Sequence, residues 1–212
     1  LAFGPSGISE PRRYHEFLTG PATQENYESS RARIRRLIGN AVARQRVSDV
    51  PIGAFLSGGL DSSIIVSHLA EATPQPVHTF CVGYADAQSY DERQYARLVA
   101  DRFGTRHEEV VLGEKDVLGA IPRVLDHMGE PVGDSSIVPT SLVSWAARQF
   151  VTVALSGDGG DELFGGYWRY LAHQTLETYL RVPAFLRGGL VEPLLSMVAI
   201  SRSSSIGNRV RQ

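Results

Sequence analysis

Residues 57–63 read SGGLDSS and gather small side chains, hydroxyl groups and one carboxylate within a single heptad. Gly58 and Gly59 carry no Cβ atom, so backbone N–H groups can approach an anion closely at these positions. The heptad follows an apolar run, residues 52–56, and precedes a sequence typical of a helix, whose positive end would face the same anion. The pattern predicts a phosphate-binding loop.

Asp61 narrows the kind of phosphate loop. A carboxylate repels a bare phosphate, but a divalent cation between the two groups removes that repulsion, and Mg²⁺ typically binds one or two carboxylates together with phosphate oxygens. The lysine of a Walker A loop is absent from the heptad, because the chain's single lysine is Lys115. The structural alternative is a glycine turn capped by Asp61 or Ser62, which the setting between a strand and a helix disfavours.

A second glycine-rich stretch carries three more carboxylates. Residues 156–162 read SGDGGDE and follow another apolar run, residues 151–155. Alone, this stretch is more typical of a surface turn followed by a helix N-cap. In a parallel sheet, however, ligands bind beyond the carboxyl ends of the strands. We therefore expect Asp158, Asp161 and Glu162 to face the first loop across one pocket.

Hydrophobic periodicity predicts the elements that position these two loops. Strands alternate with helices, which indicates the α/β class, with a doubly wound and mainly parallel sheet and helices on both faces. The expected strands are residues 52–56, 77–83, 106–112 and 151–155. The expected helices are residues 25–47, 61–72, 90–104, 114–128 and one that ends near Phe150. The first helix has one apolar face, made of Ile34, Leu37, Ile38, Ala41 and Val42.

The chain divides into three segments by composition. Residues 1–24 are rich in Gly, Pro, Ser and Thr and predict a linker or irregular arm. Residues 25–170 hold the alternating elements and both loops, and residues 171–212 read as a helical continuation of the same domain, truncated in a polar stretch. Because the chain also lacks an initiator methionine, we expect it to be a piece of a longer protein.

Composition argues against several classes of partner. The formal net charge of −2 offers no basic surface for nucleic acid, and no apolar stretch approaches the roughly 18 residues of a membrane span. The single cysteine, Cys81, cannot form a disulfide within the chain and lies in an apolar, strand-like run, which predicts a buried and inert thiol. These features fit a cytoplasmic location.

The two loops resemble known motifs. SGGLDSS resembles the pyrophosphate loop, S-G-G-x-D-S, of the ATP pyrophosphatases, which cleave ATP between its α- and β-phosphates. LSGDGGDELFGGYWRY, residues 155–170, and GEPVGDSSIVPTSLVS, residues 129–144, resemble signatures of the glutamine-hydrolysing asparagine synthetases. The resemblance runs in order from about Tyr27 to Tyr170. It indicates the C-terminal synthetase domain of that family, with an adenine nucleotide alpha hydrolase-like fold.

The resemblance implies ATP and Mg²⁺ as ligands. Asp61 and Asp161 would hold Mg²⁺ from opposite loops and take part in catalysis. Asp158, where some members have glutamate, would be the catalytic acid–base group near the incoming ammonia. Glu162 would assist the metal or cap the helix that follows. The implied nucleotide contacts are Leu56, Ser57, Gly58, Gly59, Asp61, Ser62, Ser63, Val82, Ser156 and Gly157.

The reaction implied by the resemblance is ATP-dependent amidation of aspartate to asparagine through β-aspartyl-AMP, with release of AMP and pyrophosphate. In this family the ammonia comes from a glutaminase domain that begins with a nucleophilic cysteine, and we find no such N-terminal cysteine in this sequence. The resemblance also implies that the full-length protein can form a homodimer. A lysine beyond the second loop stabilises the adenylate in the family, but no lysine follows Tyr170 here.

Two alternatives stay open at the level of sequence. One is a related amidotransferase or cyclising synthetase that acts on another carboxylate, although the acidic residue Asp158 argues against cyclisation. The other is a nucleotide-binding fragment without turnover, which the missing lysine and glutaminase domain suggest.

Overall fold

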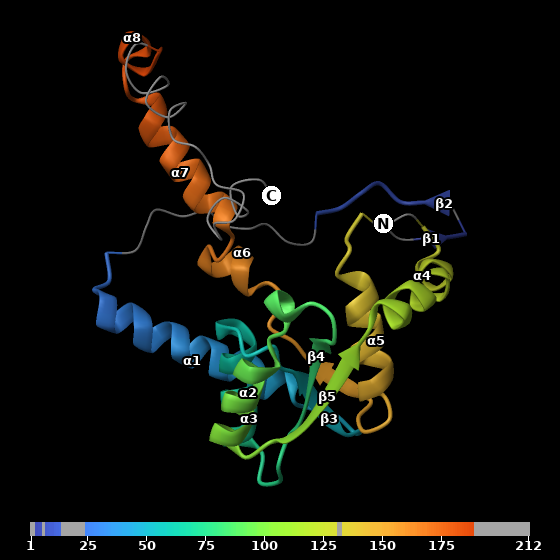
Figure 1. The fold of residues 1–212 in the computed structure, drawn as a ribbon. Coiled ribbons are helices and arrows are strands. Elements are labelled where there is room, and N and C mark those ends of the chain that lie inside the picture. The colour runs from blue at the N-terminus through green and yellow to red at the C-terminus, as the bar shows by residue number, and fades with distance from the viewer. Residues whose placement is uncertain (1–2, 6, 14–23, 131–132, 189–212) are drawn as a thin grey trace.

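The computed structural model describes residues 3–5, 7–13, 24–130 and 133–188. Its centre is a four-stranded sheet (Figure 1). The strands are β3 (Ile52–Phe55), β4 (His78–Tyr84), β5 (Arg106–Leu112) and β6 (Val153–Leu155). They lie in the order β5-β4-β3-β6, and every neighbouring pair is parallel. The predicted α/β class and all four expected strands are confirmed.

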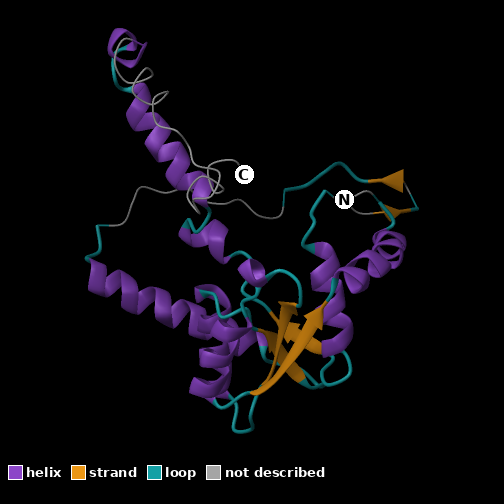
Figure 2. Ribbon diagram, viewed as in Figure 1, coloured by secondary structure: helices purple, strands orange, loops and turns teal. Residues whose placement is uncertain are grey.

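Helices cover both faces of this sheet, as Figure 2 shows. The first face carries α1 (Tyr27–Gln45), α2 (Leu60–Ala72) and α3 (Arg93–Phe103). The opposite face carries α5 (Ile137–Ala147), against which α4 (Glu114–Met128) packs. The remaining helices, α6 (Gly160–Phe164), α7 (Trp168–Leu180) and α8 (Ala184–Leu186), lead away from the sheet (Figure 1). The expected doubly wound arrangement is therefore confirmed.

The two faces of the sheet bury two separate cores. Successive strand residues point to opposite faces, so Ala54, Leu56 and Cys81 pack toward α1, α2 and α3, whereas Phe55 and Phe80 pack toward α5. A sheet that is covered on both sides needs apolar side chains at nearly every strand position. This requirement explains why the strands read as continuous apolar runs in the sequence.

The helix expected over residues 90–104 begins later in the structure. A 3-10 turn occupies residues 88–90, and α3 starts at Arg93. The cause is local, because the Asp91 carboxylate accepts the Arg93 N–H at 3.2 Å and so favours a turn before the helix. The other end follows the prediction, since Gly104 ends α3 in the left-handed conformation with φ of 63°.

The apolar face predicted for the first helix is buried only in part. Val42, near the end of α1, is 3% exposed and belongs to the core. Ile34 and Leu37, one to two turns earlier, are 41% and 53% exposed. The first half of α1 extends past the elements that α1 packs against (Figure 1), so helical spacing alone overstated the buried length of this helix.

The two ends of the chain are described only in part. Where residues 1–24 are described, β1 (Phe3–Gly4) and β2 (Gly7–Ile8) form a short antiparallel pair within the expected irregular arm. The expected continuation over residues 171–212 is helical through α7 and α8, and residues 189–212 lie outside the described residues. In the described part of the chain, no helix has the length and hydropathy needed to cross a membrane.

Candidate active site

The two glycine-rich loops meet at the carboxyl edge of the sheet. β3 and β6 are parallel neighbours with Ala54 opposite Leu155, so the loops that follow them emerge side by side. A Cβ atom added to Gly157 would lie 2.8 Å from the Ser62 nitrogen. Only glycine therefore allows this approach, and the structure brings the two predicted loops together as the strand pattern indicated.

Hydroxyl groups inside the first loop fix its shape. The Ser57 and Ser62 Oγ atoms lie 3.0 Å apart, and the Gly59 N–H donates to Ser57 Oγ at 3.2 Å. Ser62 and Ser63 both donate to the Gly59 carbonyl oxygen, at 3.3 and 2.6 Å. These hydrogen bonds hold the loop in its conformation without a ligand. Preorganisation of this kind favours anion binding at a helix N-terminus.

Gly58 has two structural reasons to be glycine. Its φ of 82° lies in the left-handed region, and an added Cβ atom would approach the Ala96 nitrogen to 2.5 Å. The first loop therefore rests on the first turns of α3. Behind it, Gly59 caps α2 without a side-chain hydrogen bond. The first N–H groups of α2 therefore have no side-chain cap from this residue, and N–H groups at a helix N-terminus can bind an anion.

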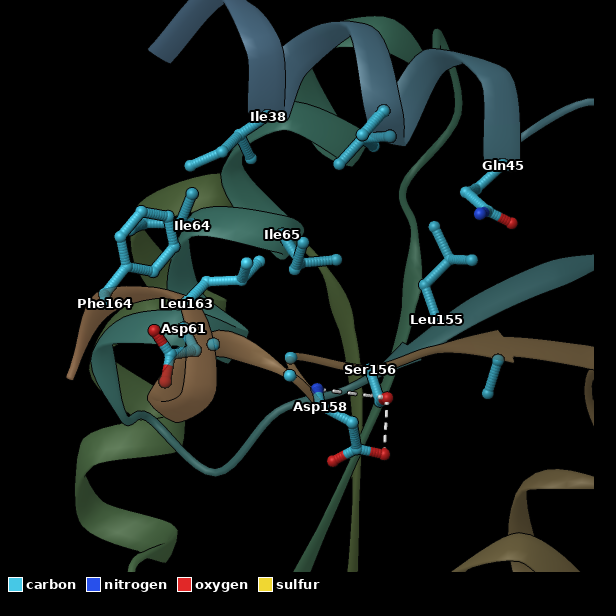
Figure 3. Close-up of a pocket in the computed structure, with 16 residues that line it drawn as sticks. Ile38, Gln45, Asp61, Ile64, Ile65, Leu155, Ser156, Asp158, Leu163 and Phe164 are labelled. Carbon is cyan, nitrogen blue, oxygen red and sulfur yellow. Dashed lines mark hydrogen bonds between the residues drawn. The ribbon is translucent and has the colours of Figure 1, made fainter. Parts of the chain in front are cut away.

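Asp158 belongs to the second loop and lies near its start. Its Oδ2 atom accepts a hydrogen bond from Ser156 Oγ at 2.9 Å, and its own N–H donates to Ser156 Oγ at 3.4 Å (Figure 3). The Asp158 side chain is exposed. Ser156 thus aims the carboxylate without removing it from solvent, which leaves an oxygen free to accept a proton.

Asp61 and Asp161 come from the first turns of α2 and α6. A Cβ atom on Gly160 would lie 2.7 Å from both carboxylate oxygens of Asp61, and one on Gly166 would lie 2.9 Å from Asp161 Cγ. Each carboxylate therefore lies directly over a glycine of the second loop or of the turn behind it. Among the described residues, neither one forms an ion pair with a basic side chain.

The chemistry of these two side chains suits a divalent cation, because carboxylates bind Mg²⁺ together with phosphate oxygens and water. Carboxylate oxygens are the ligands that Mg²⁺ prefers, and Mg²⁺ at phosphate sites is usually held by one or two of them. Within the described ranges, no group of three or more His, Cys, Asp or Glu residues forms a metal site from protein ligands alone.

A small cavity of about 210 Å³ lies at the ends of β3 and β4. Two of the predicted adenosine contacts, Leu56 and Val82, line it together with Ser57. Sequence reasoning missed its polar groups Glu92 and Thr140. Although the Glu92 side chain is exposed overall, loss of water on its inner side raises the pKa of the carboxyl. The full lining is Phe55, Leu56, Ser57, Phe80, Cys81, Val82, Tyr84, Tyr90, Glu92, Pro139, Thr140 and Val143.

Cys81 lies under this small cavity and is 3% exposed. Burial raises the pKa of its thiol to about 12, and nearby acidic residues add to that effect. The predicted burial is confirmed. A neutral, desolvated thiol is a poor nucleophile, which agrees with the inert thiol expected from the sequence.

A larger cavity of about 550 Å³ opens between α1, α2, β6 and α6 (Figure 3). Its wall is mainly apolar, whereas Asp61, Ser156 and Asp158 supply polar groups from the two loops. The predicted site residues are therefore divided between two cavities. Leu56, Ser57 and Val82 line the cavity beside β4. The cavity beside β6 is lined by Asp61, Ser156, Gly157 and Asp158. The apolar wall consists mainly of Ile38, Ala41, Val42, Ile64, Ile65, Leu155, Leu163 and Phe164.

An ionic network behind the first loop fixes α3 to the sheet. Arg93 pairs with Asp91 at 2.6 Å, and Arg97 donates to both oxygens of Glu109 on β5 at 2.5 and 2.6 Å. The Arg97 guanidinium holds the pKa of the Glu109 carboxyl below its ordinary value. The network and the contact with Gly58 therefore involve the same helix, α3. Local sequence patterns gave no signal for the network.

The fold and the site define an α/β protein in which a phosphate-type loop and an acidic loop meet at the carboxyl edge of a parallel sheet. A family model described as asparagine synthase matches residues 33–211, and the chain belongs to this family. The resemblance identified from the two loops is thereby confirmed.

Several known proteins are similar to this chain. A predicted glutamine-hydrolysing asparagine synthetase of Methanocaldococcus jannaschii is 45% identical over 154 residues, which cover 72% of this chain and 30% of that protein. Glutamine-hydrolysing asparagine synthetase 1 of Bacillus subtilis is 37% identical over 167 residues, covering 79% and 26%. This chain thus spans less than a third of the length of these relatives.

Among solved structures, an NH3-dependent NAD synthetase from Campylobacter jejuni matches with a TM-score of 0.42 and 14% identity. The match covers 68% of this chain and 61% of that one.

Proposed function

We propose that this chain is the ATP-binding synthetase part of an enzyme that converts aspartate to asparagine. The observation that carries the proposal is the contact between the two loops, in which Gly157 and Gly160 pack directly against Ser62 and Asp61. The contact supports the proposal because it brings the hydroxyls and helix N–H groups of the first loop next to the acidic second loop. Membership of the asparagine synthase family supports the same reading.

In the proposed complex, the adenosine part of ATP lies against Leu56 and Val82. Ser156 and Gly157, which line the neighbouring cavity, complete that wall. The phosphates lie on the first loop, where Ser57, Gly58, Gly59, Ser62 and Ser63 and the start of α2 supply donors. When bound between Asp61 and Asp161, Mg²⁺ would neutralise phosphate charge and stabilise the leaving pyrophosphate. Positioning and charge neutralisation are the main requirements of this kind of transfer.

The first proposed step activates the acceptor. An oxygen of the aspartate side-chain carboxylate attacks the α-phosphorus of ATP, the bond from that phosphorus to the bridging oxygen breaks, and pyrophosphate leaves. The product is β-aspartyl-AMP. The first loop contributes by holding the pyrophosphate in line with the attack, because internal hydrogen bonds already fix the shape of the loop.

The second proposed step forms the amide. Ammonia attacks the activated carbonyl carbon, a proton moves from the developing ammonium to Asp158, and the carbon–oxygen bond to AMP breaks. Asp158 suits this role because Ser156 orients its carboxylate at 2.9 Å while solvent keeps one oxygen accessible. A general base contributes when it lies within reach of the proton that it removes.

We further propose that the ammonia normally comes from a glutaminase domain outside this chain. The printed names of the relatives, glutamine-hydrolysing synthetases more than three times the length of the matched region, support this partner. A cytoplasmic location and a homodimer of the full-length protein belong to the same proposal.

The test is to supply ATP, Mg²⁺, aspartate and ammonium to the complete gene product and to measure asparagine, AMP and pyrophosphate together. Equal amounts of the three products are expected. Pyrophosphate release with another carboxylate, and none with aspartate, would instead favour the related amidotransferase or cyclising synthetase. ATP binding without pyrophosphate release would favour a nucleotide-binding fragment.

A further inference from the structure

The turn between α6 and α7 folds back over the carboxylate of Asp161. Gly165 ends α6 in the left-handed conformation, with φ of 69°, and the Gly166 N–H donates to the Asp161 carbonyl oxygen at 3.0 Å. The Asp161 side chain then lies against the Gly166 backbone so closely that a Cβ atom there would be 2.9 Å from Asp161 Cγ. The orientation of this carboxylate therefore depends on the shape of the turn.

Two successive glycines leave the backbone of this turn with little rigidity of its own. A side-chain hydrogen bond spans it, from Tyr167 Oη to Glu162 Oε1 at 2.6 Å. The bond joins the residue after Asp161 to the residue after Gly166, so it closes the same turn. A short hydrogen bond to a carboxylate is among the stronger kinds in proteins.

The Tyr167 ring is itself held by neighbours on α7. Its centroid lies 5.8 Å from that of Tyr170, and the Arg169 guanidinium carbon lies 5.0 Å from its centroid. The donor hydroxyl is thus anchored by one helix while its acceptor, Glu162, belongs to the other. The hydrogen bond therefore links α6 to the residue that precedes α7.

We propose that Tyr167 is a positioning residue for the metal-binding carboxylate. Through Glu162 it holds the turn over Asp161 and fixes the direction in which that carboxylate points. This inference rests on the proposed function, in which Asp161 is a ligand of Mg²⁺. Removal of a group that orients a metal ligand without touching the metal commonly lowers the metal affinity by about 10- to 100-fold.

The experiment measures Mn²⁺ binding to the complete gene product by electron paramagnetic resonance, with α,β-methylene-ATP present. Tyr167→Phe removes the hydroxyl and keeps the ring, and about tenfold weaker Mn²⁺ binding is expected. Glu162→Ala removes the acceptor and should weaken binding to a similar extent. The double variant should be no weaker than either single one, since the two residues act through one hydrogen bond. Tyr170→Phe is the matched control and should bind Mn²⁺ as the wild type does.

Other results would overturn the inference. Wild-type Mn²⁺ affinity in Tyr167→Phe, with or without a lower Tm, would leave the residue with a structural role only. Effects of Tyr167→Phe and Glu162→Ala that add in the double variant would mean that they do not act through each other. Asp161→Asn separates the two proposals. If it leaves Mn²⁺ affinity unchanged, the metal role of Asp161 is itself wrong. If it weakens binding while Tyr167→Phe does not, only the positioning role is wrong.

Discussion

The carboxylate of Asp61 lies against the backbone of Gly160, so closely that a Cβ atom at Gly160 would be 2.7 Å from both of its oxygens. The two residues belong to different loops and are brought together because β3 and β6 are parallel neighbours. This contact sets the spacing between the phosphate loop and the acidic loop. Any side chain at position 160 must separate them.

Gly160→Ala should therefore weaken nucleotide binding. The added methyl group has to displace the Asp61 carboxylate or shift the second loop, and overpacking of this kind typically costs about 1–3 kcal/mol. If that cost falls on binding, ATP should bind about 5- to 150-fold more weakly by isothermal titration calorimetry, since about 1.4 kcal/mol corresponds to a factor of ten.

Gly119→Ala is the matched control for that change. Gly119 lies in α4, where an added Cβ atom meets nothing within 4 Å. Replacement of a helical glycine at an unstrained position should stabilise the protein by about 0.4–1 kcal/mol and leave ATP binding unchanged. Wild-type ATP affinity in Gly160→Ala would show that the contact does not set the loop spacing.

Asp158→Asn should separate the two chemical steps. Asparagine cannot accept the proton from the attacking ammonia, and loss of a general base typically lowers the rate by about 10²- to 10⁴-fold. Aspartate-dependent pyrophosphate release should continue while asparagine formation falls by at least about 100-fold, and Asp158→Glu should restore much of it. Parallel assays of pyrophosphate and asparagine give the comparison. An equal fall in both products would place Asp158 in the adenylation step instead.

The Cys81 thiol should resist modification while the protein is folded. Its pKa is raised to about 12 by burial, so almost none of it is thiolate at pH 8. A disulfide reagent such as 5,5′-dithiobis(2-nitrobenzoate) should release no thiolate from the native chain within minutes and close to one equivalent after urea is added. Rapid reaction without denaturant would contradict the buried position of this residue.

Stability should fall as the pH drops below about 6.5, the ordinary pKa of histidine. Burial lowers the pKa of His107, so the unfolded chain binds a proton in a range where the native imidazole stays neutral. The free energy of unfolding then decreases from about pH 6.5 down to the lowered native pKa. Urea unfolding at pH 7.5 and at about pH 5.5 measures the difference.

The His107→Gln variant identifies the residue responsible. It should show a smaller fall in stability between the two pH values than the wild type does. The neighbouring Glu109 does not account for the effect in this range, because its carboxyl pKa is held low by Arg97 and titrates at lower pH. An identical fall in His107→Gln would assign the pH dependence to other groups.

Much of the site follows from local sequence. The heptad at residues 57–63 lies between a strand and a helix, and its small residues, hydroxyls and Asp61 specify a phosphate loop by their own chemistry. Continuous apolar runs also predict strands that are buried on both faces. These signals depend on neighbours along the chain, so they can be read before the fold is known.

Other features depend on residues far apart in the sequence. Periodicity along α1 predicts burial of Ile34 and Leu37, but the length of the neighbouring elements leaves them 41% and 53% exposed. The pairing of Arg97 with Glu109 follows from the packing of α3 on β5. No spacing rule marks this contact.

The sequence by itself determined the α/β class and predicted a phosphate-type first loop and an acidic second loop, because each is encoded by hydrophobic periodicity or by residue types within a few positions. Only the tertiary structure decided that Gly160 packs against the Asp61 carboxylate and Gly166 against the Asp161 side chain. It also decided that the Tyr167 hydroxyl donates a hydrogen bond to Glu162. Such contacts depend on strand order and on how a glycine turn folds back. Distances of a few ångströms between separate elements exist only once the sheet has assembled.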